Sequence, residues 1–253
     1  MKICYFTGTG NCLYVARRIG GELLSIPQLM KQEEITITDD AVGIVAPVYA
    51  CEMPMMVREF MAKAKIETDY LFFVYTYGSG FGCAFAHAAL AAREAGRELD
   101  YIYAVKMVDN YLPMFEMQEQ MDTVGAKDVE GQLDFVCSEI AERKKRPAVI
   151  TERTYSEMAR FKKMLAEPIL RKETAQEYLV DDTCIHCGVC AQVCPANNIV
   201  VSEESVTFLD RCEVCYACLQ NCPKGALHMR EERSTVRFRN EHITLKEIIA
   251  AND

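Results

Sequence analysis

The sequence predicts an open α/β sheet of parallel strands, followed by a small α+β unit rich in cysteine. Two observations lead to this fold class. Short apolar segments alternate with segments of helical period over roughly the first 140 residues. Eight of the thirteen cysteines then fall in two copies of one motif. Half of the residues are hydrophobic and 26% are charged, which is typical of a folded globular protein.

The first unit is predicted to open with a strand at Lys2–Phe6 and a helix over Asn11–Leu24, where apolar residues recur at helical spacing. A second apolar run, Val42–Val48, precedes a helix over Pro54–Ala64, because proline is tolerated in a first turn. The run Tyr70–Tyr77 is almost continuously aromatic or β-branched, which is typical of a strand buried on both faces.

The same alternation continues to the end of the first unit. We expect a weak strand at Glu34–Ile37 and a helix over Cys83–Ala95 that is ended by Gly96. A further strand is expected at Leu99–Met107, and an amphipathic helix over Val129–Ile140. Strands separated by helices predict a parallel sheet covered by helices on both faces.

A basic stretch follows, from Arg143 to Lys172. It has ten Lys/Arg against three Glu, a local charge of +7 in a chain of net charge −9. Pro147 and Pro168 interrupt it, so we expect a connector with helical character. A solvated connector that offsets acidic neighbours is the favoured interpretation, and a docking face for an acidic redox partner is the alternative.

The end of the chain is predicted to form a strand and a helix. Thr235–Phe238 alternates in polarity, and Thr244 with Glu247 has the spacing of a capping box beside the apolar pair Ile243 and Ile248. The expected segments are therefore the sheet unit at 1–146, the connector at 147–178, the cysteine-rich unit at 179–232 and the tail at 233–253.

Charge and hydropathy restrict the class of protein. A net charge of −9 argues against a nucleic-acid binder, and no apolar run has the length of a membrane span. The first apolar stretch is broken by TGTG and no small-residue cleavage site follows it, so no signal peptide is expected. We expect a cytoplasmic protein. Disulfides are disfavoured in that compartment, so the cysteines need another explanation.

The cysteine motif reads C-x₂-C-x₂-C-x₃-C-P in both copies. In this spacing three sulfurs can converge on a cube of iron and sulfide, while the fourth cysteine, expected to open a helix, ligates the other cluster. A zinc site would need paired C-x₂-C units with longer gaps. We therefore assign one cluster to Cys184, Cys187, Cys190 and Cys222, and the other to Cys212, Cys215, Cys218 and Cys194.

This segment strongly resembles the two-cluster bacterial ferredoxins over roughly the last third of the chain. The resemblance implies two 4Fe-4S clusters that carry single electrons at low potential. His186 lies between two ligands and is expected at the surface rather than on a cluster. Asp181–Arg230 holds six acids and three bases, which suits a redox protein partner with a basic patch.

Three loops leave the carboxyl ends of the predicted strands, where open α/β sheets bind ligands. The first has neither the lysine of a Walker loop nor the third glycine of G-x-G-x-x-G. Its glycines and the following helix can still hold a phosphate through backbone N–H groups, and an ordinary glycine-rich turn is the alternative. The candidate binding residues are Thr7, Gly8, Thr9, Gly10, Asn11 and Cys12 in the first loop, Pro47, Val48 and Tyr49 in the second, and Tyr77, Gly78, Ser79 and Gly80 in the third.

The first loop resembles the flavodoxin phosphate loop, T-x-T-G-N-T/S, except that Cys12 stands at the final hydroxyl position. The flavodoxin likeness implies FMN, with its ring between the second and third loops beside Tyr49 and Tyr77. The whole chain resembles the bacterial flavodoxin–ferredoxin fusion proteins. A flavodoxin-like doubly wound sheet is therefore expected before the ferredoxin-like domain.

Three smaller features have open interpretations. Asn110–Gln118 either covers the flavin or is an ordinary surface loop. A redox role for Cys12 is the alternative to burial as a small apolar group. Burial is also expected for the other cysteines outside the motif, Cys4, Cys51, Cys83 and Cys137.

The expected function is electron transfer between two 4Fe-4S clusters and FMN, which relays electrons between one-electron carriers and the flavin. One alternative is a flavin-dependent reductase acting on a small organic substrate. Another is a ferredoxin whose flavodoxin-like domain has lost FMN and serves for docking. No catalytic acid–base pair stands out, and the sequence does not indicate an oligomeric state.

Overall fold

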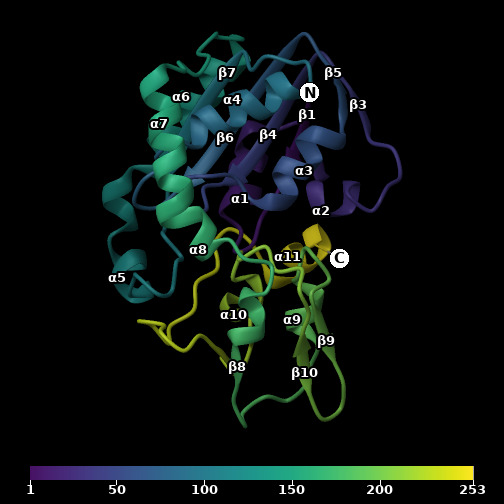
Figure 1. Cartoon of the computed structure of the whole chain (residues 1–253), viewed down its shortest axis with the longest axis vertical. Helices are drawn as coiled ribbons and strands as arrows, with labels where there is room; N and C mark the ends of the chain where they lie inside the picture. Colours follow the sequence, from purple (N-terminus) through teal and green to yellow (C-terminus); the bar gives the residue numbers. More distant parts are fainter. Residues whose placement is uncertain (253) are drawn as a thin grey trace.

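The computed structural model describes residues 1–252. Its centre is a parallel five-stranded sheet, which confirms the parallel sheet expected from the sequence (Figure 1). Numbered among themselves in chain order, the strands lie in the order 2-1-3-4-5, which is consistent with a flavodoxin-like doubly wound sheet. Across the sheet they are β2 (Glu22–Ser25), β1 (Lys2–Tyr5), β4 (Ala41–Pro47), β6 (Tyr70–Tyr77) and β7 (Tyr101–Lys106).

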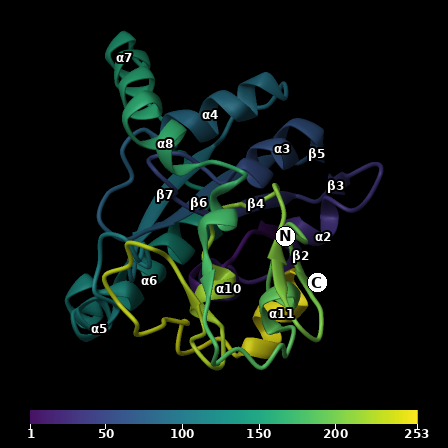
Figure 2. The ribbon, with the colours of Figure 1, turned by 60° about the horizontal axis from the view of Figure 1, so that its bottom comes forward.

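Helices cover both faces of this sheet. On one face α1 (Asn11–Ile19) contacts α6 (Val129–Ala141), and on the other α3 (Met55–Lys63) contacts α4 (Ala84–Glu94). Figure 2 shows α3 and α4 on one side of the strands and α6 on the other. The central strand β6 is consequently buried on both faces, as its aromatic and β-branched sequence predicts.

The long helix predicted over Asn11–Leu24 is wrong at its C-terminal end. Gly20 and Gly21 have φ of 86° and 102°, a left-handed conformation that ends α1. The chain then reverses into β2, in which Leu23 pairs with Ile3. Leu23 therefore belongs to an edge strand that the sequence pattern did not reveal.

The weak strand expected near Ile37 forms slightly later, as β3 (Thr36–Thr38). It pairs in parallel with β5 (Lys65–Glu67), which was not predicted, in a separate two-stranded sheet. Three further elements connect the strands and helices of this unit. The helix α2 (Ile26–Leu29) lies between β2 and β3, and α5 (Met117–Asp122) and the 3-10 turn η1 (Val124–Lys127) lie between β7 and α6.

The connector is helical, as predicted, and it passes through Pro168 without a break. It contains α7 (Glu152–Phe161), the π-helical turn η2 (Lys162–Ala166) and α8 (Glu167–Ile169). The π-helical turn η2 directly precedes α8, and the helical run ends at Ile169, one residue after Pro168. The helix therefore continues through Pro168, contrary to the expected interruption, and ends immediately after it. A 3-10 turn, η3 (Thr174–Glu177), completes the connector.

The cysteine-rich unit is a small α+β structure beneath the sheet unit in Figure 1. Two antiparallel pairs, β8 with β11 and β9 with β10, are joined by two short helices. Its apolar core includes Val108, Leu112 and Met117 from the segment after β7. The elements are β8 (Leu179–Val180), α9 (Val189–Gln192), β9 (Ile199–Val201), β10 (Val206–Phe208), α10 (Ala217–Gln220) and β11 (Leu227–His228).

The strand expected at Thr235–Phe238 does not form. The Val236 N–H donates to Ser234 Oγ, and the Phe238 N–H donates to Gln220 Oε1 at 2.7 Å, so side chains take the place of a neighbouring strand. The predicted helix and its capping box are confirmed as α11 (Leu245–Asn252), which packs against both α2 and α9 (Figure 1). The tail thus lies between the two units.

None of the helices within residues 1–252 combines the length and apolar character that a membrane span requires.

Candidate functional site

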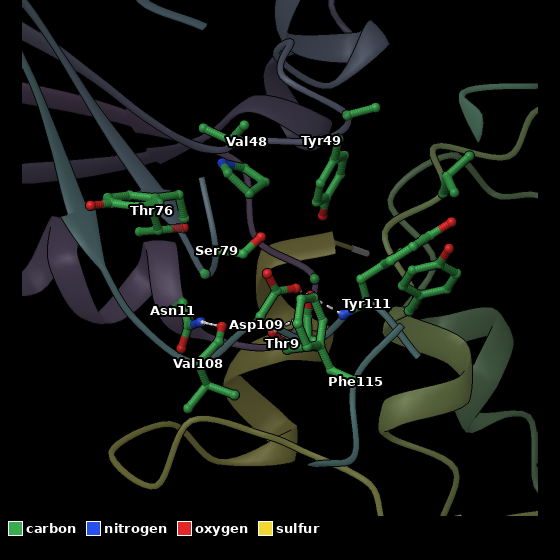
Figure 3. Close-up of a pocket in the computed structure, with 18 of the residues that line it drawn as sticks. Thr9, Asn11, Val48, Tyr49, Thr76, Ser79, Val108, Asp109, Tyr111 and Phe115 are labelled. Carbon is green, nitrogen blue, oxygen red and sulfur yellow. Dashed lines mark hydrogen bonds between the residues drawn. The ribbon is translucent and has the colours of Figure 1, made fainter. Parts of the chain in front are cut away.

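The carboxyl ends of β1, β4, β6 and β7 meet a cavity of about 230 Å³, here called the sheet-edge cavity (Figure 3). Twelve of the thirteen residues predicted to bind FMN line it. The exception is Gly10, where an added Cβ would lie 3.0 Å from Asn240 and Ile243 of the tail. The structure therefore brings the three predicted loops together at one site.

The first loop is held in shape by hydrogen bonds. Thr7 Oγ1 accepts the N–H of Gly10 at 3.1 Å, and Thr9 Oγ1 accepts from Asn110 Nδ2 at 2.8 Å. The Asn11 side chain donates to the Val108 carbonyl at 3.3 Å. Because α1 begins at Asn11, the loop also lies at the N-terminus of a nine-residue helix. No lysine or arginine of residues 1–252 lines this cavity.

Cys12 is 2% exposed and its Sγ lies 3.1 Å from Thr76 Oγ1. Burial raises the pKa of this thiol to about 12, so it stays protonated at neutral pH. This geometry suits a small buried side chain rather than a redox thiolate. Cys4 and Cys83 are also buried, whereas Cys51 and Cys137 are half-buried, contrary to the expectation of burial for both.

The second and third loops face each other across the cavity. Tyr49 and Glu52 exchange two backbone hydrogen bonds around a tight turn in which Ala50 and Cys51 have φ of 49° and 66°. Figure 3 shows the Tyr49 hydroxyl pointing toward the space between the loops. In the third loop, a Cβ on Gly78 would lie 2.1 Å from Asp109, so only glycine fits beside this residue.

The loop after β7 covers one side of the cavity. Tyr111, Met114 and Phe115 line the wall, so part of Asn110–Gln118 borders the cavity in which a flavin was expected. Asp109 was not predicted; burial raises the pKa of its carboxyl group, which accepts the Tyr111 N–H at 3.2 Å. Its only sequence signal was its position directly after an apolar strand.

The remaining wall comes from segments far away in the sequence. Leu165, Ile169 and Leu170 of the connector line the cavity, as do Val214 and Tyr216 from the second cysteine motif. None of these was predicted. One signal was present, since Tyr216 stands where the first motif has Gly188, and both adopt a left-handed conformation.

The eight motif cysteines line two separate pockets. Each pocket takes three cysteines from one motif and one from the other, which is the arrangement assigned from the spacing. The outer pocket contains Cys184, Cys187, Cys190 and Cys222, and the inner pocket contains Cys194, Cys212, Cys215 and Cys218.

Two details of the motif differ from expectation. The helix α9 begins before Cys190, so Cys194 follows this helix rather than opening it. His186 is half-buried and lines the outer pocket instead of lying fully at the surface. Within residues 1–252, no three His, Cys, Asp or Glu side chains converge closely enough for a single metal ion.

The chemistry of the inner pocket suits a charged metal centre. Burial raises the pKa of Cys212 to about 11, so its sulfur would stay protonated unless metal charge balanced the thiolate. Backbone N–H groups already point at sulfur, from Val214 to Cys212 Sγ and from Asn198 to Cys194 Sγ, both at 3.3 Å. Such donors stabilise thiolate-bound clusters.

Comparison with known proteins concerns the second unit. Residues 176–223 match the family described as a 4Fe-4S dicluster domain, and this range contains all eight cysteines of the two pockets. The match shows a 4Fe-4S dicluster ferredoxin domain at 176–223, which supports electron transfer. A search of curated proteins found no match to the chain.

Proposed function

We propose that this protein transfers electrons between two 4Fe-4S clusters and a bound FMN, and so relays electrons between one-electron carriers and the flavin. One observation supports this most directly. The cavity lined by the three loops predicted to bind FMN is also lined by Val214 and Tyr216, which stand between cluster cysteines. A flavin there would lie against the iron–sulfur domain.

The first loop is the proposed phosphate site. Backbone N–H groups of Thr7–Cys12 and the N-terminus of α1 would hold the phosphate without a cation. Tyr49 and Tyr77 would flank the ring, and Gly78–Gly80 would offer backbone donors to its edge. FMN would supply a group that exchanges one or two electrons, whereas each cluster exchanges one.

The outer and inner pockets are the proposed cluster sites. In each, three cysteines of one motif and the fourth of the other would ligate one cube of iron and sulfide. The division into a sheet unit at 1–146, a connector at 147–178, a ferredoxin-like unit at 179–232 and a tail at 233–253 belongs to the same proposal.

Cofactor content tests the proposal. Protein purified and reconstituted without oxygen should contain about eight irons, about eight acid-labile sulfides and one FMN per chain. Thr9→Val, which removes the hydroxyl that accepts from Asn110, should weaken FMN binding and leave the iron content unchanged.

Thr207→Val is the matched control, because Thr207 is exposed on β10 away from the cavity. Eight irons without flavin, even after incubation with excess FMN, would instead support a ferredoxin with a docking module. Absence of iron after anaerobic reconstitution would refute the proposal altogether.

A further inference from the structure

The two cysteine pockets are placed differently relative to the sheet-edge cavity. An added Cβ on Gly8 would lie 2.7 Å from the Cys215 carbonyl oxygen, so the inner pocket packs directly on the first loop. Glu213, which lines the inner pocket, accepts the Met56 N–H at 3.0 Å. The inner pocket is therefore fixed to the sheet unit through both Cys215 and Glu213.

Tyr216 forms part of both sites, because it lines the sheet-edge cavity and the inner pocket alike. It is 5% exposed, and its ring centroid lies 5.9 Å from that of Tyr111, another residue of the cavity wall. Its φ of 56° is unusual for a bulky residue, and the first motif uses Gly188 with φ of 76° at the same position. The chain thus retains a strained aromatic residue between the inner pocket and the cavity.

The outer pocket lies at the opposite end of the second unit. Among residues 1–252, none of its lining residues also lines the sheet-edge cavity. Cys187 is exposed and Ile185 is 58% exposed, whereas Cys194, Cys212 and Cys215 of the inner pocket are buried. In Figure 1 the turn between β9 and β10 lies at the lower end of the molecule.

Three exposed acids stand close in sequence to residues that line the outer pocket. Glu203 and Glu204 occupy the turn between Val201 and Val206, which both line the pocket, and Asp182 precedes its first cysteine by two residues. All three acids are exposed. Lys224, which lines the pocket, offsets one of these three negative charges, so the rim keeps a net negative charge, and thiolate-ligated clusters would add to it.

We propose that the outer pocket is the entry and exit point for electrons, at a docking face formed by Ile185 and the acidic rim of Asp182, Glu203 and Glu204. Its partner is a one-electron redox protein with a basic rim around its redox group. The inner pocket, through Tyr216, is the one that exchanges electrons with the flavin. This inference rests on the proposed function. The connector and the loop after β7 cover the flavin site, which directs a protein partner to the exposed pocket.

The electrons balance along this route. Each reduced carrier would give one electron to a cluster held by Cys184, Cys187, Cys190 and Cys222, and that cluster would pass it to the one held by Cys194, Cys212, Cys215 and Cys218. Two such electrons, with two protons from solvent, would match the two-electron capacity of FMN, and the reverse sequence would return them singly to two oxidised carriers. No co-reactant other than the one-electron carrier and the flavin is required.

The docking face is tested with cytochrome c, a basic one-electron protein, as the probe. With clusters reduced beforehand by a chemical reductant that is then removed, the triple variant D182N/E203Q/E204Q should reduce cytochrome c with a second-order rate about tenfold lower at low ionic strength, and the difference should fade as salt is added. Binding of redox-inactive zinc-substituted cytochrome c, followed by calorimetry, should weaken in parallel.

The control E33Q/E34Q/E94Q removes the same charge from exposed acids of the sheet unit and should change neither quantity. Equal effects of the two triple variants, or no effect of the rim variant, would overturn the docking face. Because this assay needs only the clusters, it gives an answer even if no flavin is bound.

The order of the clusters is tested separately. An iron chelator should remove iron in two phases, and Cys187→Ser should abolish the fast one, because the exposed pocket loses its cluster first. Tyr216→Leu should slow electron exchange between flavin and clusters at least tenfold, and Tyr216→Phe should restore the exchange.

A fast phase that survives Cys187→Ser but disappears in Cys218→Ser would reverse the proposed order. If Tyr216→Leu left the rate of electron exchange between flavin and clusters unchanged, Tyr216 would have no part in the proposed electron-transfer route. Loss of FMN from the native protein would instead count against the proposed function, which separates the two failures.

Discussion

At the scale of single residues, Tyr216 shows how a local conflict indicates function. A bulky residue in the left-handed region costs about 1–3 kcal/mol, and the first motif avoids this cost with Gly188. In the second motif the tyrosine lines the sheet-edge cavity. The sequence contained this signal, but it became meaningful only when the cavity showed what the ring touches.

Replacement of Tyr216 by glycine should separate strain from function. We expect Tyr216→Gly to leave the stability of the flavin-free protein within about 1 kcal/mol of the native value, because relief of strain offsets the lost packing. FMN should bind at least tenfold more weakly, since the cavity loses a wall. Thermal unfolding and fluorescence titration measure the two effects, with Tyr216→Phe as the control that keeps the ring. Native FMN affinity in the glycine variant would contradict this interpretation.

Cys12 permits a second test at the residue scale. Its thiol has a pKa raised to about 12 by burial, so the reactive thiolate is scarce at pH 8. Iodoacetamide at pH 8 should therefore leave Cys12 unmodified in the folded protein while it labels the half-buried Cys51. Peptide mass spectrometry of the native and unfolded protein measures this difference. Labelling of Cys12 at the rate seen for Cys51 would revive the redox alternative.

At the scale of elements, prediction succeeded where the local pattern and the packing agree. The run Tyr70–Tyr77 forms β6 over the predicted range, because both faces of the strand are buried by helices. It failed where a tertiary partner decides the outcome. Leu23 fits a helical period, but two glycines in a left-handed conformation place it in β2, and Thr235–Phe238 finds the Gln220 side chain instead of a strand.

The β8–β11 pair has a pH-dependent clamp. His228 bonds Glu232 and Asp181 at 2.8 and 2.9 Å, and Arg237 also bonds Glu232. The hydrogen bond with Glu232 is the largest cause that raises the pKa of His228. Protonated His228 therefore stabilises the folded state fully below the ordinary pKa of about 6.5, and this stabilisation is lost as the pH rises through the raised pKa. The pKa of Asp181 is lowered, mainly by its hydrogen bond with the Thr183 side chain. Ionised Asp181 therefore stabilises the folded state fully above the ordinary pKa of about 3.9, and this stabilisation is lost as the pH falls through the lowered pKa.

The clamp should therefore be strongest between about pH 4 and pH 6.5. His228→Gln should lower the thermal midpoint at pH 5.5 by a few degrees, and by less at pH 8.5, where His228 is less protonated. Scanning calorimetry at the two pH values measures this. The exposed His242→Gln serves as the control, and an equal shift at both pH values would assign the effect to packing rather than to charge.

At the scale of the whole molecule, the sequence predicted the parts of the site better than their assembly. Each of the three loops follows its own strand, so their meeting at one sheet edge is a property of parallel sheets. The walls from Leu165, Ile169, Val214 and Tyr216 depend on contact between segments far apart in the chain. No periodicity or spacing encodes such a contact, because it arises from the packing of one folded unit on another.

That packing couples the two proposed cofactors. The inner pocket rests on Gly8 of the first loop, and Tyr216 lines the cavity, so the folded state of the second unit shapes the proposed flavin site. Iron removal by a chelator should weaken FMN binding at least tenfold, equivalent to about 1.4 kcal/mol of coupling free energy. Linkage requires the reverse effect, so saturating FMN should slow the loss of inner-pocket iron and leave that of the outer pocket unchanged.

Flavin titration of holo and iron-free protein measures the first effect, and iron release with and without FMN measures the second. The variant Cys187→Ser is the internal control, because loss of the outer cluster alone should leave FMN affinity near the native value. Equal FMN affinity in the holo and iron-free forms would show that the sheet unit binds flavin independently. The wall from the second motif would then be a boundary of the cavity without influence on the ligand inside it.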